Sequence, residues 1–373
     1  MKLKPLNPKR DFGIDALRIL SMLMIVTHHL ITHGGLLKSR PLFSTGYNAL
    51  LVLDIAVLCA VNCYVLISGY VGLYTRHKYS SIASLWLQVF VYSFGITMLF
   101  KYYKPGSVKG TLLFRSTIPA LGRMYWFFTA YFILFLVMPM LNAAVLNLSR
   151  RRVRFMLITL ILFIGVFSSV YDAYYNSDIY LVNRGYAPWW MMVIYMVGAY
   201  IRKYDVFSGV KRFWFLIIFF IDVAAASSMK LWLRQYFFEK YGSFKYDTLL
   251  LKYTSLNICI AAAALFLFFR GLHFKPFVNR IIAFLAPMVF SVYLIHDHPL
   301  VRDHIIKVKL KPLQSMGSAK MIGALAVAAV GIYLACSLID LARLWIFKLL
   351  HIKPLLVKIE DFAKKPKKRA SGK

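Results

Sequence analysis

The chain has 373 residues, of which 60% are hydrophobic and 16% charged, and 46 Lys and Arg residues outnumber 14 Asp and Glu residues. With a mean hydropathy of +0.64, this composition excludes an ordinary soluble domain, whose surface needs more charge. A net charge of +32 would indicate nucleic-acid binding in a soluble protein. Here the basic residues lie mainly in short loops and at the two ends, so we interpret them as a topology signal and an attraction to anionic membrane lipids, with no nucleic-acid partner.

Apolar runs of about 20 residues, the length that crosses a bilayer, recur along the whole chain. In lipid each run must be a helix, because a helix satisfies its own backbone hydrogen bonds. The first run carries internal charges and lacks a small-residue cleavage site, so we interpret it as a retained helix rather than a signal peptide. We predict an all-α polytopic membrane protein of about ten transmembrane helices, at residues 14–33, 48–73, 84–100, 124–141, 153–171, 187–202, 213–230, 253–270, 281–300 and 321–347.

Loop charge predicts how these helices are oriented. With the N-terminus in the cytoplasm, the loops at 149–154, 202–212 and 270–280 are cytoplasmic, and all three are basic, as the positive-inside rule expects. Two loops on the opposite side, 101–123 and 301–320, are also basic, and we expect them to lie against lipid headgroups or to bind an acidic glycan. We predict an N-in/C-in, multi-pass protein of the cell (cytoplasmic) membrane.

The membrane domain is predicted to occupy residues 1–350, followed by a basic cytoplasmic tail at 351–373. The segment 231–252 is aromatic and mixed in charge, which is typical of an interfacial amphipathic stretch. Thiols inside apolar runs behave as small hydrophobic side chains. We therefore expect neither a disulfide nor a metal site from the four cysteines, Cys59, Cys63, Cys259 and Cys336.

The first predicted helix holds ionisable residues that an apolar span normally excludes. Arg18 and His29 are eleven positions apart, so they share one helical stripe, offset by about 20° and separated by roughly 16 Å along the axis. Asp15 can pair with Arg18 three positions later, whereas His28 points about 100° away from His29. Either Arg18 snorkels to the interface and the histidines bond to neighbouring helices, or Arg18 binds the phosphate of a cytoplasmic donor and His29 acts as a general base. We favour the second interpretation, because ionisable residues inside spans are usually functional.

The second predicted helix and the loop after it contribute further candidates. Asp54 lies inside that span, and Ser68 and Gly69 near its end are small residues that we expect to serve close helix packing. Arg76 and Lys78 follow on the cytoplasmic side. This basic pair either sets the topology or anchors an anionic donor.

Near the other end of the chain, His296, Asp297 and His298 stand side by side. We interpret them either as a carboxylate–imidazole relay or as the outer membrane boundary. Adjacent residues on a helix point apart, so we expect no single metal ion to bind all three, and we predict no metal site. Trp126 opens a segment that is typical of packing and of an interfacial aromatic belt.

Five segments, taken in this order, resemble the acyltransferase-3 family of bacterial membrane O-acyltransferases. The resemblance covers about residues 11–347, and its most specific feature is an arginine followed by ten residues and a histidine, which Arg18 and His29 fit. The five segments are "IDALRILSMLMIVTHH", "NCYVLISGYVGLY", "YWFFTAYFILFLVMPMLN", "WWMMVIYMVGAYIRKY" and "FSVYLIHDHPLVR".

The resemblance implies ten core transmembrane helices and transfer of an acyl group, usually acetyl, from cytoplasmic acyl-CoA to a hydroxyl of a cell-surface polysaccharide or a lipid-linked glycan precursor. It implies that His29 is the catalytic histidine and that Arg18 binds the donor. Many members have a spaced arginine pair after the second helix; here Arg76 is followed by His77 and Lys78, and we predict Arg76 and Lys78 as further donor-binding residues. The supporting candidates are Asp15, His28, Trp126, His296 and Asp297.

Some alternatives remain open at this level. A polysaccharide exporter without transferase activity would also line a path with polar residues, whereas a structural membrane subunit would leave the Arg18–His29 stripe unexplained. His29 either takes the acyl group itself or deprotonates the acceptor hydroxyl. No permanently bound cofactor is expected, since acetyl-CoA or another acyl-CoA is a substrate, and the expected partners are this donor, the glycan acceptor and membrane lipids.

Overall fold

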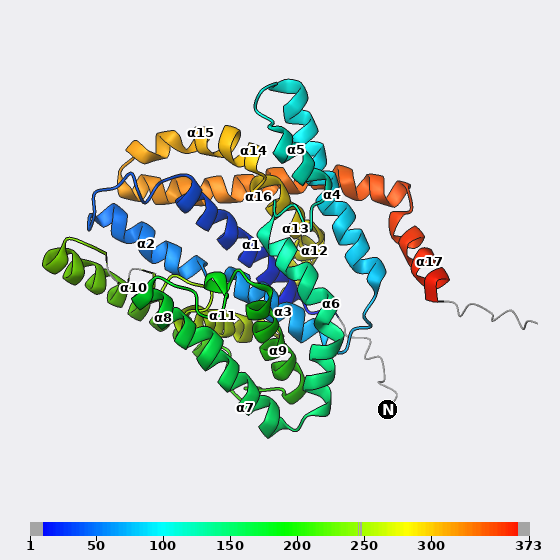
Figure 1. Cartoon of the computed structure of the whole chain (residues 1–373), viewed down its shortest axis with the longest axis horizontal. Helices are drawn as coiled ribbons and strands as arrows, with labels where there is room; N and C mark the ends of the chain where they lie inside the picture. The colour runs from blue at the N-terminus through cyan, green and yellow to red at the C-terminus, as the bar shows by residue number, and fades with distance from the viewer. Residues whose placement is uncertain (1–9, 245, 247, 365–373) are drawn as a thin grey trace, which may run out of the picture.

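The computed structural model describes residues 10–244, 246 and 248–364 of the chain (Figure 1). Short 3-10 or π-helical turns, labelled η, separate some of its helices. In chain order the elements are α1 (Phe12–His33), α2 (Thr45–Val57), α3 (Ala60–Gly72), α4 (Tyr79–Tyr103), α5 (Gly110–Thr117), α6 (Trp126–Asn147), α7 (Arg150–Leu160), η1 (Ile161–Phe167), α8 (Ser168–Tyr175), η2 (Asn183–Gly185), α9 (Pro188–Tyr204), α10 (Phe213–Tyr241), α11 (Leu256–Phe269), α12 (Pro276–Leu285), η3 (Ala286–Met288), α13 (Val289–His296), α14 (Pro299–Val301), η4 (Arg302–Ile306), α15 (Lys307–Leu310), η5 (Lys311–Ser315), α16 (Ser318–Leu349) and α17 (Ile352–Lys364).

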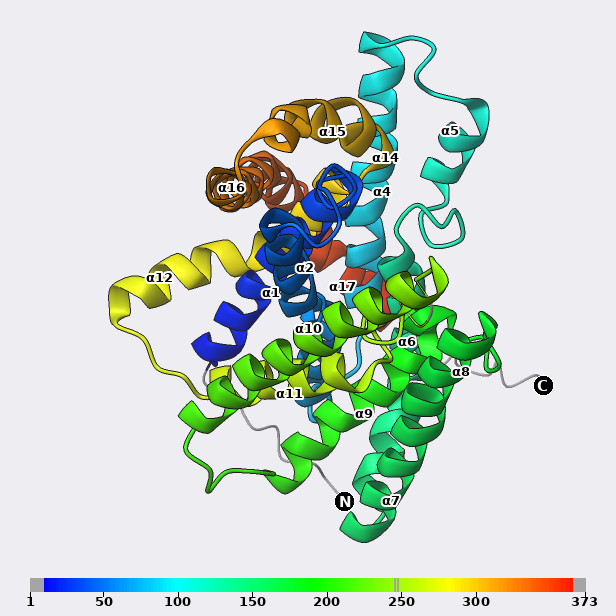
Figure 2. The same cartoon turned by 90° about the vertical axis from the view of Figure 1, so that its left-hand side faces the viewer.

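Two helices lie outside the main bundle. The short helix α5 stands beside the end of α4, within the basic loop predicted at 101–123 (Figure 2). At the other end of α4, Glu360 of α17 accepts hydrogen bonds from the backbone N–H groups of Tyr79 at 3.2 Å and Ser80 at 2.9 Å. The predicted basic tail is thus helical as far as α17 extends, and residues 365–373 lie outside the described part of the chain.

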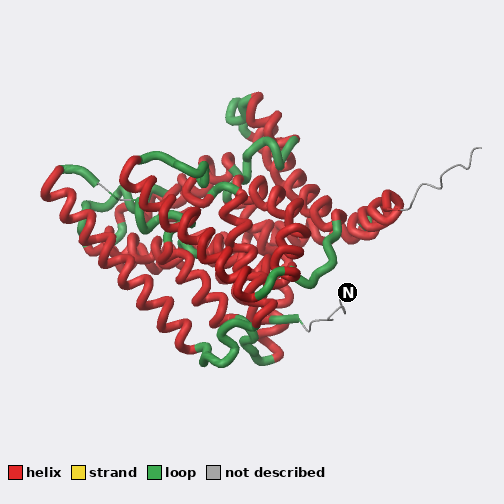
Figure 3. Tube along the Cα trace, turned by 60° about the horizontal axis from the view of Figure 1, so that its bottom comes forward, coloured by secondary structure: helices red, strands yellow, loops and turns green. Residues whose placement is uncertain are grey.

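The described residues are 78% helical and contain no β-strand (Figure 3). Within them, eight helical segments are long and apolar enough to cross a membrane. The predicted all-α, polytopic membrane fold is therefore confirmed. The predicted spans at 187–202 and 253–270 correspond to α9 with 17 residues and α11 with 14, which are shorter than the other spans. The number of ten membrane crossings stays a prediction.

The second predicted span, 48–73, is not one continuous helix. α2 ends at Val57 and α3 begins at Ala60, with turn residues Leu58 and Cys59 between them. The apolar run has no Pro or Gly at this point, so no helix-breaking residue predicts the break. The predicted span at 48–73 still corresponds to one apolar segment, Thr45–Gly72, that is long enough to cross a membrane.

The helix predicted at 213–230 extends further than expected, into the interfacial stretch predicted at 231–252. The first half of this stretch continues α10 as far as Tyr241, because no Gly or Pro interrupts the helix before Gly242. Gly242 adopts a left-handed conformation with φ of 61° and ends the helix, as glycine commonly does at a C-terminus. The connection to α11 follows.

Contacts between loops define two opposite faces of the bundle. At the face that we call the N-terminal face, the Gly271 N–H donates to Asp11 Oδ2 at 3.2 Å, joining the start of α1 to the α11–α12 connection. At the opposite or far face, Gln314 Nε2 donates to the Gly34 carbonyl oxygen at 2.9 Å, joining the end of α1 to η5. α1 therefore runs from one face to the other. Which face is cytoplasmic stays a prediction.

Small residues let α3 and α9 pack closely. A Cβ atom on Gly69 would overlap the carbonyl oxygen of Tyr195, and one on Gly198 would overlap the carbonyl oxygen of Leu66. The packing role predicted for Gly69 is confirmed, since any larger side chain would push the two helices apart.

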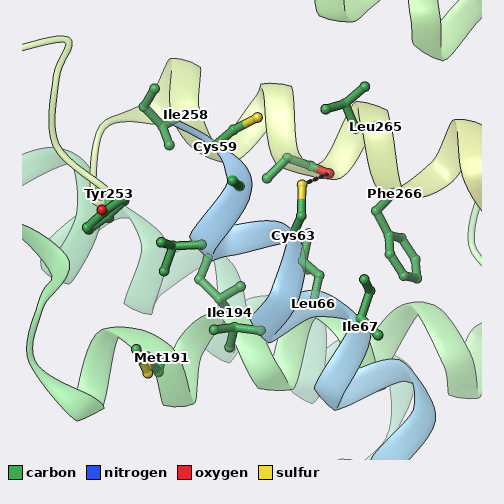
Figure 4. Close-up of a cluster of buried hydrophobic side chains, with 14 of the residues drawn as sticks. Cys59, Cys63, Leu66, Ile67, Met191, Ile194, Tyr253, Ile258, Leu265 and Phe266 are labelled. Carbon is green, nitrogen blue, oxygen red and sulfur yellow. Dashed lines mark hydrogen bonds between the residues drawn. The ribbon is translucent and has the colours of Figure 1, made fainter. Parts of the chain in front are cut away.

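Cysteines contribute to the apolar core between α3, α9 and α11, which Figure 4 shows in close-up. Cys63 Sγ lies 3.7 Å from the carbonyl oxygen of Ala262 on α11. All four cysteines are free thiols, and Cys59 and Cys63 are fully buried. They act as small apolar side chains at the helix contacts.

Candidate active site

A buried pocket lies between α1, the α2–α3 break, the start of α6 and α13. Its lining is mostly apolar and aromatic, yet both adjacent histidines of α1 face it. We call this cavity the histidine pocket. Its lining includes His28, His29, Tyr64, Trp126, Phe127 and Tyr293.

A chain of hydrogen bonds fixes which nitrogen of His29 is free. His296 Nδ1 lies 2.6 Å from the carbonyl oxygen of Val292, which only accepts, so this Nδ1 carries the hydrogen and Nε2 of the same neutral ring is an acceptor. His29 Nδ1 lies 2.9 Å from that Nε2 and therefore donates to it. The remaining nitrogen of neutral His29, Nε2, then holds a lone pair, and no other described residue bonds to it. General-base catalysis requires such a nitrogen.

His28 is held by a different partner. Its Nδ1 lies 2.7 Å from Asp54 Oδ1, on α2. Both side chains are largely buried, with 18% of His28 and 9% of Asp54 exposed. Since a carboxylate accepts, Nδ1 of His28 carries a hydrogen, and no described residue bonds to its Nε2.

Toward the far face, His29 adjoins a cluster around one carboxylate oxygen. Asp297 Oδ1 lies 3.6 Å from His29 Nδ1, 3.9 Å from His33 Nε2 and 3.8 Å from Arg302 Nη1. His29, His33 and Asp297 offer ligand atoms within 4.8 Å of one another, a spacing that suits a metal ion. Because the Arg302 guanidinium already brings positive charge to the same oxygen, we assign this cluster to charge compensation.

Of the three adjacent polar residues at the end of α13, two adjoin His29 and the third lies against α4. His296 contacts His29, whereas His298 Nε2 lies 3.3 Å from the carbonyl oxygen of Ser93 on α4. Asp297 faces the cluster around Arg302. The expectation that these neighbours point apart holds for His298, whereas His296 and Asp297 both adjoin His29.

A second pocket opens at the N-terminal face, between α1, α3, α6 and the loop after α3. We call it the basic pocket. Arg76 and Lys78 are exposed at it, and 32% of the Arg18 side chain is exposed. His77 packs on Phe135 with ring centroids 4.1 Å apart, and burial lowers the pKa of His77, so this imidazole is mostly uncharged at neutral pH. The positive charge therefore comes from the three other basic side chains.

Arg18 is fixed in place by its neighbours on both sides. The expected ion pair is present, with Asp15 Oδ1 2.5 Å from Arg18 Nη1. Asp15 also pairs with Arg10 at 2.6 Å, so one carboxylate faces two guanidinium groups and positive charge is left over. Tyr64 Oη donates to the backbone carbonyl oxygen of Arg18 at 2.6 Å.

The two pockets adjoin each other along the same three helices. In each helix, residues four positions apart, or about 6 Å along the axis, line one pocket and then the other. The pairs, with the residue of the basic pocket first, are Arg18 and Met22 in α1, Ser68 and Tyr64 in α3, and Tyr131 and Phe127 in α6.

A family model described as an acyltransferase domain matches residues 11–341 of the chain. The chain belongs to the acyltransferase-3 family. The match includes the lining of both pockets, and it confirms the resemblance seen in the sequence. No curated protein and no solved structure matches the chain. The protein is a membrane acyltransferase in general terms.

Within this acyltransferase, the predicted residues fall into three groups. The histidine pocket brings together His28, His29 and Trp126, and the basic pocket brings together Arg18, Arg76 and Lys78. The others lie directly behind these linings, as Asp15 does behind Arg18 and as His296 and Asp297 do behind His29.

Two residues of the site, His33 and Tyr64, were absent from the candidates drawn from the sequence, and a third, Asp54, was noted there without a role. The sequence does point to a role for Asp54, because a carboxylate inside an apolar span needs a partner. His33 lies one turn beyond His29 on the same stripe, so helix geometry pointed to it. Nothing in the sequence pointed to Tyr64, since nothing local distinguishes it from a packing tyrosine. Only the fold places it between the two pockets.

Proposed function

We propose that this acyltransferase moves an acetyl group from cytoplasmic acetyl-CoA to a hydroxyl of a cell-surface polysaccharide or a lipid-linked glycan precursor, as a multi-pass protein of the cell membrane. The observation that carries the proposal is the adjacency of two unlike pockets. One is basic and open at the N-terminal face, and the other is apolar, buried and lined by His29.

The basic pocket suits the phosphate groups of coenzyme A. Arg18, Arg76 and Lys78 provide positive charge from two elements, and guanidinium groups bind phosphate with two parallel hydrogen bonds. The flexible pantetheine arm would then pass Tyr64, and the thioester would enter the histidine pocket. An uncharged acetyl group fits the apolar lining.

His29 would act as the general base in this pocket. Its Nε2 would take the proton of the acceptor hydroxyl while the hydroxyl oxygen attacks the thioester carbonyl carbon. The carbon–sulfur bond then breaks, leaving the acetyl ester and coenzyme A. His296 and the Val292 carbonyl oxygen support this role, because they keep the hydrogen of His29 on Nδ1.

The acceptor would approach from the far face. The segment 301–320 at this face carries five Lys and Arg residues, among them Arg302 beside the cluster that adjoins His29. This charge favours an anionic acceptor, such as an acidic polysaccharide.

His29→Ala tests the proposal. Acyl transfer should fall by at least about 100-fold, measured as O-acylation of surface glycans by mass spectrometry in cells that produce equal amounts of each protein. His273→Ala, which changes a histidine outside both pockets, is the matched control and should keep full activity. Unchanged acylation in the His29 variant would refute the assignment.

The same protein, purified and supplied with radiolabelled acetyl-CoA, separates this function from export. A transferase hydrolyses or transfers the label, and a pure exporter does neither.

A further inference from the structure

We propose that His28, held by Asp54, is the general acid of this site and protonates the sulfur of the departing coenzyme A. The inference rests on the proposed function. It gives the two adjacent imidazoles of α1 opposite roles, with His29 as base and His28 as acid.

The geometry places His28 where an acid is needed. Its ring lines the histidine pocket together with that of His29, and the two ring centroids are 5.9 Å apart. Asp54 holds Nδ1, and no described residue bonds to Nε2, so this nitrogen is available to a substrate in the pocket.

The charges around the two histidines differ. Asp54, 2.7 Å from His28 on α2, is the counter-charge for an imidazolium at that position. His29 has no carboxylate of its own, because Asp297, at 3.6 Å, is shared with His33 and Arg302. Two like groups in unlike surroundings, one with a carboxylate of its own and one without, are an arrangement that can divide acid from base in an active site.

The reaction needs an acid because of the apolar lining. A thiolate is stable in water, but it is poorly stabilised in a buried pocket lined mainly by apolar and aromatic side chains. In the proposed step His29 takes the proton of the hydroxyl, the new carbon–oxygen bond forms, the carbon–sulfur bond breaks, and His28 Nε2–H gives its proton to sulfur. The proton on His29 then passes to His28, directly or through one water molecule, so the net change moves the hydroxyl proton to the thiol.

The test varies how much the leaving group needs a proton. Inverted membrane vesicles from the source cells, which supply the natural acceptor, carry wild-type protein, His28→Gln or Asp54→Asn in place of the chromosomal copy. Two donors are compared, acetyl-CoA and S-(4-nitrophenyl) thioacetate, whose aryl thiolate leaves without protonation. Thiol release above that of vesicles without the protein is the readout.

We expect His28→Gln to lower thiol release from acetyl-CoA by roughly 100-fold and release from the aryl thioester by less than about threefold, since only the first reaction uses the acid. Asp54→Asn keeps a hydrogen-bonding side chain at this position and should show the same selectivity with a smaller loss. Asp222→Asn, a carboxylate change on α10 outside both pockets, is the matched control and should leave both donors unaffected.

Equal losses with both donors would overturn the inference, because a merely structural role does not depend on the leaving group. Full activity of both variants would overturn it as well. If wild-type protein released no thiol from acetyl-CoA above the background, the proposed function itself would fail, and that outcome is distinct from the other two.

Discussion

Two buried carboxylates of this acyltransferase have different surroundings. Asp172 of α8 lies 2.5 Å from Lys252 Nζ, and Lys252, with 1% of its side chain exposed, also donates to the Ser169 carbonyl oxygen at 2.9 Å. Asp54 binds His28 instead, and His28 keeps one ring nitrogen unbonded at a pocket. Burial of charge by itself therefore does not mark the site. What marks the candidate site is a buried histidine–carboxylate pair that leaves one polar atom for a substrate.

Lys252→Met, which removes the partner of Asp172, is expected to cause the largest loss of stability. It leaves Asp172 buried with only Arg184, whose Nε lies 3.3 Å away. Breaking a buried ion pair costs about 3–5 kcal/mol, so the melting temperature in detergent should drop clearly. Turnover of acetyl-CoA at low temperature should stay within about twofold of wild type, because neither pocket is touched.

A companion variant sharpens this prediction. Removing both charges, as Lys252→Met with Asp172→Asn, should restore part of the lost stability, since no unpaired buried charge is left. If Lys252→Met lost turnover while its melting temperature stayed unchanged, the comparison would fail, because Lys252 would then belong to the catalytic site.

His296→Ala should have an intermediate effect, on activity rather than stability. Without the acceptor nitrogen of His296, His29 loses the bond that fixes its tautomer, and kcat should fall roughly 10- to 100-fold. The KM for acetyl-CoA should not change, because in the proposed binding mode the phosphates lie in the other pocket. His29→Ala combined with His296→Ala should be no slower than His29→Ala alone. Additive losses would show that His296 acts independently of His29.

The smallest effects are expected at the basic pocket. Arg76→Ala or Lys78→Ala should raise the KM for acetyl-CoA by about three- to tenfold at low salt, with kcat unchanged, and salt should reduce the difference from wild type. Arg151→Ala removes a basic residue from the α6–α7 side of the bundle without touching this pocket, and its KM should match wild type. If Arg151→Ala and Arg76→Ala raised the KM equally, the basic residues would act through a general surface charge rather than a donor site.

Much of the fold was predictable because its cause is local. An apolar run in lipid forms a helix to satisfy its backbone, and each predicted span falls mainly on helical residues. The break at Leu58 and Cys59 was not predictable, since no helix-breaking residue marks it in the sequence. The extent of α10 was misjudged because mixed charge in 231–252 resembled an interfacial segment.

The sequence alone determined that this is a helical membrane protein and that Arg18 and His29 share a stripe of α1, because helix periodicity is a property of consecutive residues. Only the tertiary structure decided what those residues can do. His296 lies 267 positions from His29, and Asp54 lies 26 positions from His28 and on another helix. A ring nitrogen is donor or acceptor according to the group it faces, and helix packing brings those groups together across the sequence.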